Sequence, residues 1–136
     1  MLIIDTGVIY AAAATDDRNH NKSKSLLRGT EGPIVASELV VTEACHLLCD
    51  RIGPKAELAL IHSISNGEIV VEAMAQSEWS RIEQLVKRYL DLPLGVVDAS
   101  LIVLTERHNA PILATFDHRH FSVVRPNHVK YLTLVP

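Results

Sequence analysis

The sequence has few of the features that would place it in a specialised structural class. Aromatic residues are scarce, two cysteines are too few for a disulfide framework, and there are no internal repeats or low-complexity tracts. No apolar run approaches the roughly 20 residues of a membrane span, and the opening residues lack the basic region and cleavage site of a signal peptide. We therefore expect a protein that stays in the cytoplasm and contacts no membrane.

An excess of positive charge is also missing. The chain has 13 Lys and Arg residues against 16 Asp and Glu residues, which gives a formal net charge of −3 at pH 7. This balance excludes a protein that holds nucleic acid by bulk charge alone. Any contact with a nucleic acid therefore has to be local or assisted by a metal ion.

The two cysteines, Cys45 and Cys49, are spaced to share one face of a helix. We expect buried thiols at both positions. A metal half-site formed together with His46 is the alternative, but His46 would point away from the cysteines on a helix. We therefore set the cysteine site aside.

The composition is otherwise that of a folded globular protein. Apolar residues make up 48% of the chain and charged residues 21%, so disorder is not indicated. A chain of 136 residues is long enough to bury one core but too short for two independent cores. We expect a single domain that spans residues 1–136.

Short apolar runs alternate with longer amphipathic segments along the chain. Ser37 is a suitable helix cap and Pro54 suits the first turn of a helix. Residues 116–127 are expected to be mostly loop. The strands are predicted at residues 2–4, 34–36, 68–72, 112–115 and 129–135. The helices are predicted at residues 8–14, in a short segment ending at 28, and at residues 37–52, 56–65, 77–90 and 98–107.

Strands separated by helices of this length predict right-handed crossovers and a mainly parallel sheet. Helices should then cover both faces of the sheet, which is a three-layer α/β/α fold. In such folds ligands bind at the carboxyl ends of the strands. Functional side chains are therefore expected where the predicted strands end.

Four acidic residues stand at positions that this fold would bring together. Asp5 follows the first strand and Asp117 follows the strand at 112–115. Asp98 opens a helix after a loop, so all three aspartates can converge on one edge of the sheet. Glu43 faces solvent or a cleft, because it lies about 160 to 200° around its helix from the apolar stripe. That stripe is expected to contain Val41, Ala44, Cys45, Leu48 and Ile52.

Each acid taken alone has a simpler explanation. Asp98 can cap its helix, Asp5 and Asp117 can serve turns, and Glu43 can be a solvated surface carboxylate. Together, however, crowded carboxylates repel one another unless protons or hard cations neutralise them. Magnesium or manganese meets that need and can activate water against a phosphoryl group. The four acids together therefore favour phosphodiester hydrolysis.

Four short motifs, in a specific order and spacing, extend over nearly the whole chain. They are Ile3-Ile4-Asp5-Thr6, Val41-Thr42-Glu43-Ala44, Leu94-Gly95-Val96-Val97-Asp98-Ala99, and Thr115-Phe116-Asp117 with Phe121 following. In these residues the chain resembles the PIN-domain ribonucleases. It is similar in particular to the short VapC toxins of bacterial toxin-antitoxin pairs.

The resemblance implies an acidic site made of Asp5, Glu43, Asp98 and Asp117. It also implies supporting hydroxyl groups from Thr6 and Thr115, while Asp91 is an extra acid without an assigned role. One or two ions of Mg²⁺ or Mn²⁺ would activate water for in-line attack on an RNA phosphodiester, which leaves a 5′-phosphate and a 3′-hydroxyl. Gly7 departs from the family, where Ser or Asn is frequent, so one polar contact is expected to be missing.

Basic residues near Asp117 in the sequence are candidates to place the RNA. Arg107, Arg119 and Arg125 are the residues that we select, and the alternative is that they belong to a solvated loop. His118 or His120 could also be interpreted as a general base. A metal ion that acidifies water makes such a base unnecessary, so we leave the histidines out of the catalytic set.

Three other functions compete with this interpretation. Asp5-Thr6-Gly7 matches the active-site triplet of aspartic proteases, but those enzymes are almost wholly β and this chain is rich in helical patterns. A receiver-like phosphoacceptor domain needs adjacent acids after an early strand and a lysine after a late strand, and neither is present. A catalytically inactive module that binds protein or RNA remains the alternative, although the four retained acids argue against it.

The resemblance also implies partners. A VapC-like protein would form a homodimer and bind a cognate antitoxin whose tail lies across the acidic cleft and silences it. Apolar stripes on the helices at 37–52 and 54–65 suit such an interface, or they are simply core. Transfer RNA and ribosomal RNA both remain open as substrates, because specificity lies in groove shape and scattered loop contacts.

Overall fold

Five short apolar strands form the centre of the molecule, and the computed structural model describes all residues from 1 to 136. Every strand pairs in parallel, in the order β3-β2-β1-β4-β5. The predicted sheet is therefore confirmed, and it is wholly rather than mainly parallel. The strands are β1 (Leu2–Ile4), β2 (Ile34–Ser37), β3 (Val70–Glu72), β4 (Ile112–Ala114) and β5 (Thr133–Val135).

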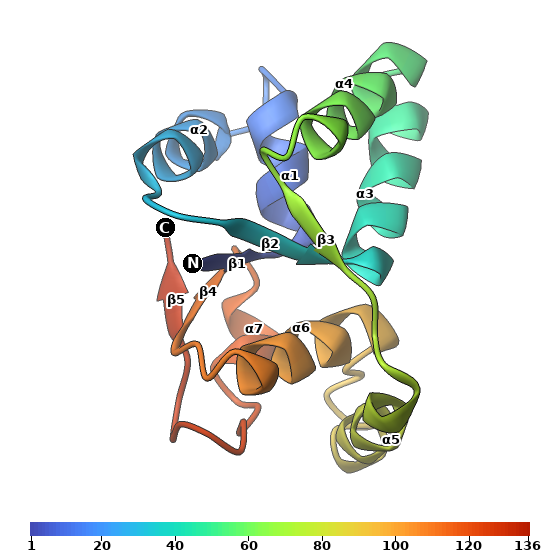
Figure 1. Cartoon of the computed structure of the whole chain (residues 1–136), viewed down its shortest axis with the longest axis vertical. Coiled ribbons are helices and arrows are strands. Elements are labelled where there is room, and N and C mark those ends of the chain that lie inside the picture. The colour runs from blue at the N-terminus through green and yellow to red at the C-terminus, as the bar shows by residue number, and fades with distance from the viewer.

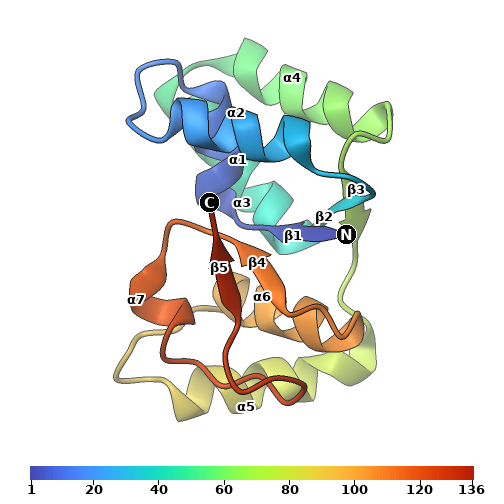
Figure 2. The ribbon, with the colours of Figure 1, turned by 90° about the vertical axis from the view of Figure 1, so that its left-hand side faces the viewer.

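Helices cover both faces of this sheet, so the three-layer α/β/α prediction is confirmed (Figures 1 and 2). A 3₁₀ turn at Gln76–Glu78 precedes α5. One face carries α1 (Thr6–Ala13), α2 (His20–Gly29), α3 (Glu38–Arg51) and α4 (Pro54–Ser65). The other face carries α5 (Trp79–Arg88), α6 (Val96–Arg107) and α7 (His118–Phe121). None of these helices combines the length and apolar character needed to cross a membrane.

Local sequence signals explain where several helices begin and end. The Ser37 hydroxyl accepts a hydrogen bond from the Val40 amide at 3.1 Å and caps α3, as predicted. Gly53 has a φ of 138°, a backbone conformation that side chains other than glycine rarely permit, and it separates α3 from α4. Pro54 then occupies the first turn of α4.

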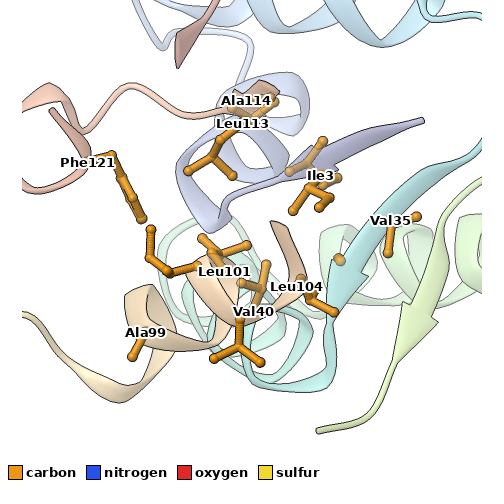
Figure 3. Close-up of a cluster of buried hydrophobic side chains, with 14 of the residues drawn as sticks. Ile3, Val35, Val40, Ala99, Leu101, Leu104, Leu113, Ala114 and Phe121 are labelled. Carbon is orange, nitrogen blue, oxygen red and sulfur yellow. The ribbon is translucent and has the colours of Figure 1, made fainter. Parts of the chain in front are cut away.

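The core lies on both sides of the sheet and includes residues 99–105 of α6. Figure 3 shows Ile3 of β1, Leu113 of β4, Val40 of α3 and Leu101 of α6 gathered in one cluster, and all four are buried. Each such side chain contributes roughly 1.5–3 kcal/mol when it leaves water. Because this core surrounds the central strands, it holds their carboxyl ends in fixed positions.

The buried face of α3 is rotated by part of a turn from the predicted apolar face, so that prediction is wrong in part. Val40, Ala44 and Leu48 are buried, whereas Val41 is half-buried and Ile52 is 47% exposed. Residues four apart lie nearly above one another on a helix, and only the tertiary structure decides which such row meets the sheet. The expected burial of both thiols is also wrong, because Cys45 is half-buried and Cys49 is exposed.

Three predicted strands, at 68–72, 112–115 and 129–135, are shorter than expected, and one helix was missed. The last strand spans only Thr133–Val135, because β4 offers just three residues for pairing. The amide of Glu68 bonds to the Ser63 carbonyl and so completes the turn after α4, which delays β3 to Val70. The predicted loop after Phe116 contains the short helix α7, which Asp117 caps.

The strand order changes direction at the centre of the sheet. From β1 the chain moves to β2 and β3 on one side, and it then crosses to β4 and β5 on the other side. In open α/β sheets the crevice for a ligand lies at such a switch point, at the carboxyl ends of the two strands. Asp5 follows β1 and Thr115 follows β4 at this point.

Candidate active site

Asp5 is the most buried acid of the site, with 8% of its surface exposed. Its Oδ1 accepts a hydrogen bond from the Thr6 amide at 2.6 Å, which caps α1, and its Oδ2 accepts from the Thr115 hydroxyl at 2.7 Å. Burial raises the pKa of Asp5 above its ordinary value, while these two hydrogen bonds lower it in part. The nearby charges of Glu43 and Asp117 raise the pKa of Asp5 further.

Thr115 connects the ends of the two central strands. Its fully buried hydroxyl donates to Asp5 and accepts from the Asp117 amide at 2.9 Å. Asp117 in turn caps α7 by accepting a hydrogen bond from the His120 amide at 3.1 Å. Thr115 therefore fixes the position of Asp117 relative to Asp5.

Glu43 reaches this edge from the middle of α3. It is exposed, and its Oε2 accepts a hydrogen bond from the Thr6 hydroxyl at 2.6 Å. Because the amide of Thr6 also bonds to Asp5, this one residue holds both carboxylates. The Glu43 side chain is thus directed at the acidic cluster and away from the apolar face of α3.

Asp98 lies in the first turn of α6 and is half-buried. It does not cap the helix, because the cap position belongs to Gly95. Burial raises the pKa of Asp98 to about 6, and the charge of Asp5 raises it as well. Asp117 and Glu43 add smaller effects in the same direction, whereas His120 lowers the pKa of Asp98.

His120 is a site residue that the sequence interpretation left out. Its Nδ1 lies 2.6 Å from Oδ2 of Asp117 and 3.3 Å from Oδ2 of Asp98. Its Nε2 lies 2.9 Å from the Leu92 carbonyl oxygen, which can only accept, so Nε2 carries a proton. The sequence interpretation weighed this residue only as a general base, whereas the helix α7 places it on the same side as Asp117, three residues earlier.

The donor set fits a divalent cation. Asp98, Asp117 and His120 each offer one ligand atom, and these atoms all lie within 4.8 Å of one another. Asp5 and Glu43 add carboxylates whose charges act on the same centre. Sites rich in carboxylate oxygen suit Mg²⁺ and Mn²⁺, and an imidazole nitrogen is also accepted by Mn²⁺. A bound cation would offset the repulsion that raises these pKa values.

Two of the three arginines selected from the sequence make contacts with other parts of the molecule. Arg107 is held at the far end of α6 by ion pairs with Glu72 and Glu78. Arg125 stacks on the ring of Tyr131, with its guanidinium carbon 4.0 Å from the ring centroid. Arg119 is exposed on α7, one residue before His120.

Two other positions noted in the sequence have no partner in the site. Asp91 is exposed in the turn after α5 and makes no hydrogen bond or ion pair. Gly7 is exposed in the first turn of α1, and a Cβ atom there would meet nothing within 4 Å. Space for a larger residue is therefore present at this position.

Comparison with known proteins agrees with this architecture. A model of the PIN domain matches residues 2–125. Ribonuclease VapC26 of Mycobacterium tuberculosis is 29% identical over 135 residues, which cover 99% of this chain and 100% of that protein.

Two solved structures share the fold. The crystal structure of Mycobacterium tuberculosis VapC20, a sarcin-ricin loop cleaving toxin, superposes with a TM-score of 0.85 at 21% identity, over 96% of this chain and 99% of that one. FitAcB from Neisseria gonorrhoeae gives a TM-score of 0.59 at 16% identity, over 86% and 88% of the two chains. The match of the family model over nearly the full length confirms the family predicted from the sequence. The chain belongs to the PIN domain family.

Proposed function

We propose that the protein is an endoribonuclease that depends on Mg²⁺ or Mn²⁺ and acts as the toxin of a toxin-antitoxin pair. The observation that carries this proposal is the convergence of four acids at the switch point of the sheet, linked through Thr6, Thr115 and His120. The full-length similarity to a VapC ribonuclease supports the same activity. Ribosomal RNA and transfer RNA are the substrates that we propose.

In the proposed reaction Asp5, Glu43, Asp98 and Asp117 would hold the cation, and His120 positions the last two of these acids. A bound divalent cation acidifies water and stabilises negative charge on a phosphoryl oxygen. The task of the chain is to keep the carboxylates in place before the substrate arrives. The Thr115 hydroxyl holds Asp5 and the Thr6 hydroxyl holds Glu43. His120 holds Asp98 and Asp117.

We further propose that the protein forms a homodimer in the cytoplasm and binds a cognate antitoxin. Exposed apolar residues on α3 and α4, namely Ile52, Leu58 and Ile61, support an interface on this layer. A cavity of about 190 Å³ with mostly apolar walls lies between α1, α2, α3 and α4. It offers space for an apolar side chain of a partner.

Total bacterial RNA incubated with the purified, antitoxin-free protein is expected to give discrete fragments when Mn²⁺ or Mg²⁺ is present. The fragments should disappear in EDTA, because the acids alone supply no Lewis acid. Sequencing of the fragment ends identifies the substrate and shows whether the products carry 5′-phosphates. Asp98→Asn serves as the negative control. Intact RNA under all metal conditions would favour a non-catalytic binding module instead.

Replacement of His120 by Phe is expected to weaken Mn²⁺ binding by about 10- to 100-fold, the effect typical for residues that orient metal ligands. The change removes the contacts with Asp98 and Asp117 but retains a ring of similar size. Isothermal titration with Mn²⁺ measures the effect directly, without an activity assay.

A matched variant, His46→Phe, places the same substitution on the exposed face of α3 and should leave Mn²⁺ affinity unchanged. His120→Gln retains a polar group near the acids and should recover part of the affinity. If His120→Phe lowers only the melting temperature and leaves Mn²⁺ affinity as in the wild type, the residue is structural and does not position the ligands.

A further inference from the structure

A second cavity lies beside the acidic site, between the connection from α1 to α2 and the residues that follow β4. Its volume is about 410 Å³. Figure 2 shows the C-terminus between α2 above and the chain from β4 to α7 below, and Pro136 forms part of the wall. The lining residues are Arg18, Asn19, Lys22, Phe116, His118 and Pro136.

The side chains of this cavity have the opposite charge from those of the catalytic centre. Arg18 and Lys22 are exposed, and neither forms an ion pair, whereas Arg81 and Arg107 are both neutralised by glutamates. No lining side chain is acidic. In a protein whose net charge is −3, two free cations at one cavity form a local positive field.

The cavity continues the wall of the acidic site. Phe116 and His118 are the two neighbours of Asp117 in the chain. Thr115, one residue earlier, donates its hydroxyl proton to Asp5. A polyanionic strand with one phosphate at the acids can therefore reach this cavity with a neighbouring nucleotide.

We propose that this cavity is a subsite for a nucleotide that flanks the scissile phosphodiester of single-stranded RNA. The inference rests on the proposed nuclease function. Arg18 and Lys22 bind the phosphate, because guanidinium and ammonium groups are the usual protein partners of phosphate oxygens. The half-buried ring of Phe116 offers a surface on which the base can stack. The volume lies within the range of small-ligand sites.

The subsite explains how a chain of negative net charge can hold RNA. The acids repel phosphate until a cation is bound, so attraction has to come from nearby positive groups. The arginines first selected for this role are paired with glutamates, stacked on Tyr131 or separate from the cavity. Arg18 and Lys22 come from the opposite layer of the fold and meet the β4 connection only in three dimensions.

The test compares RNA binding by the wild type and by the double variant Arg18→Ala/Lys22→Ala. The probe is a fluorescein-labelled oligouridine of about 12 nucleotides, titrated in EDTA so that no cleavage occurs, with fluorescence anisotropy at several salt concentrations. We expect the double variant to bind on the order of tenfold more weakly. The slope of log K against log salt should fall by about 1.4, since each lost phosphate contact on a single strand accounts for about 0.7.

Arg28→Ala/Lys55→Ala is the matched control, because it removes two exposed, unpaired cations from α2 and α4 outside the cavity. It should keep the wild-type affinity and salt slope. Equal losses in both double variants would overturn the subsite in favour of a diffuse charge effect. Metal-dependent cleavage by the wild type together with unchanged RNA binding by Arg18→Ala/Lys22→Ala would also overturn it, while the nuclease proposal stands. A wild type that neither binds nor cleaves RNA would refute the nuclease proposal and the subsite with it.

Discussion

Asp98→Asn is expected to lose RNA cleavage by about 10²- to 10³-fold or more and, in EDTA at pH 7.5, to become more stable than the wild type. Activity falls because a carboxylate that helps to hold the cation is gone. The gain in stability arises because burial and the charge of Asp5 disfavour ionised Asp98 in the folded protein, which is why its pKa rises to about 6. Relief of this penalty on the ionised carboxylate corresponds to about 1–3 kcal/mol.

Urea unfolding in EDTA and a cleavage assay with Mn²⁺ measure the two effects on the same preparation. Asp50→Asn makes the same chemical change on the exposed surface of α3 and should alter neither quantity. Retention of full cleavage by Asp98→Asn would remove this residue from the proposed catalytic set. A loss of stability in EDTA would show that its carboxylate is compensated by contacts other than those described.

Saturating Mg²⁺ or Mn²⁺ is expected to raise the melting temperature of the wild type, by roughly 5–15 °C when the cation is present at about 100 times its Kd. The folded protein binds the cation and the unfolded chain does not. The shift should be small at pH 5 and larger at pH 7.5, because the cation needs ionised carboxylates. Differential scanning fluorimetry at matched ionic strength measures it.

Without metal, the stability that Asp98 and Asp5 contribute falls as the pH rises. The folded-state pKa values of Asp98 and Asp5 are raised above those of the unfolded chain. The contribution of these groups to stability is therefore fully present below about pH 4 and, for Asp98, is lost as the pH rises through about 6. The cation restores that stability at neutral pH. Two outcomes would count against the site. One is a melting temperature of the wild type that saturating metal leaves unchanged at pH 7.5. The other is an equal rise of the melting temperature in Asp98→Asn.

Much of the fold can be predicted from the order of short apolar runs and amphipathic segments. Ser37 starts α3 because its hydroxyl caps the helix, and Pro54 starts α4 because its backbone angle φ is already helical. Both effects depend on residues only a few positions apart. Parallel pairing is favoured by the long connections between successive strands, because parallel strands need a crossover connection, which is usually helical. For the same reason the acids that follow β1 and β4 were expected at one edge of the sheet.

Other features depended on contacts that no local pattern contains. The sequence interpretation leaves His120 out because metal-bound water needs no histidine base, yet its ring contacts Asp117, Asp98 and the Leu92 carbonyl. The buried row of α3 was displaced to Val40, Ala44 and Leu48 because the packing of α3 against its neighbours decides its rotation. Arg107, selected as an RNA contact, forms ion pairs with Glu72 of β3 and Glu78 of the turn before α5.

The sequence by itself determined the α/β class and predicted a single domain with four acids at one site, because strand ends, helix caps and periodicity depend on residues close together in the chain. Only the tertiary structure decided which acids Thr6 and Thr115 bind, that His120 joins them, and that Arg18 and Lys22 line a cavity with Phe116 and His118. These contacts join residues up to 110 positions apart. Their distances depend on how the helices pack on the sheet, and that packing is a property of the whole core.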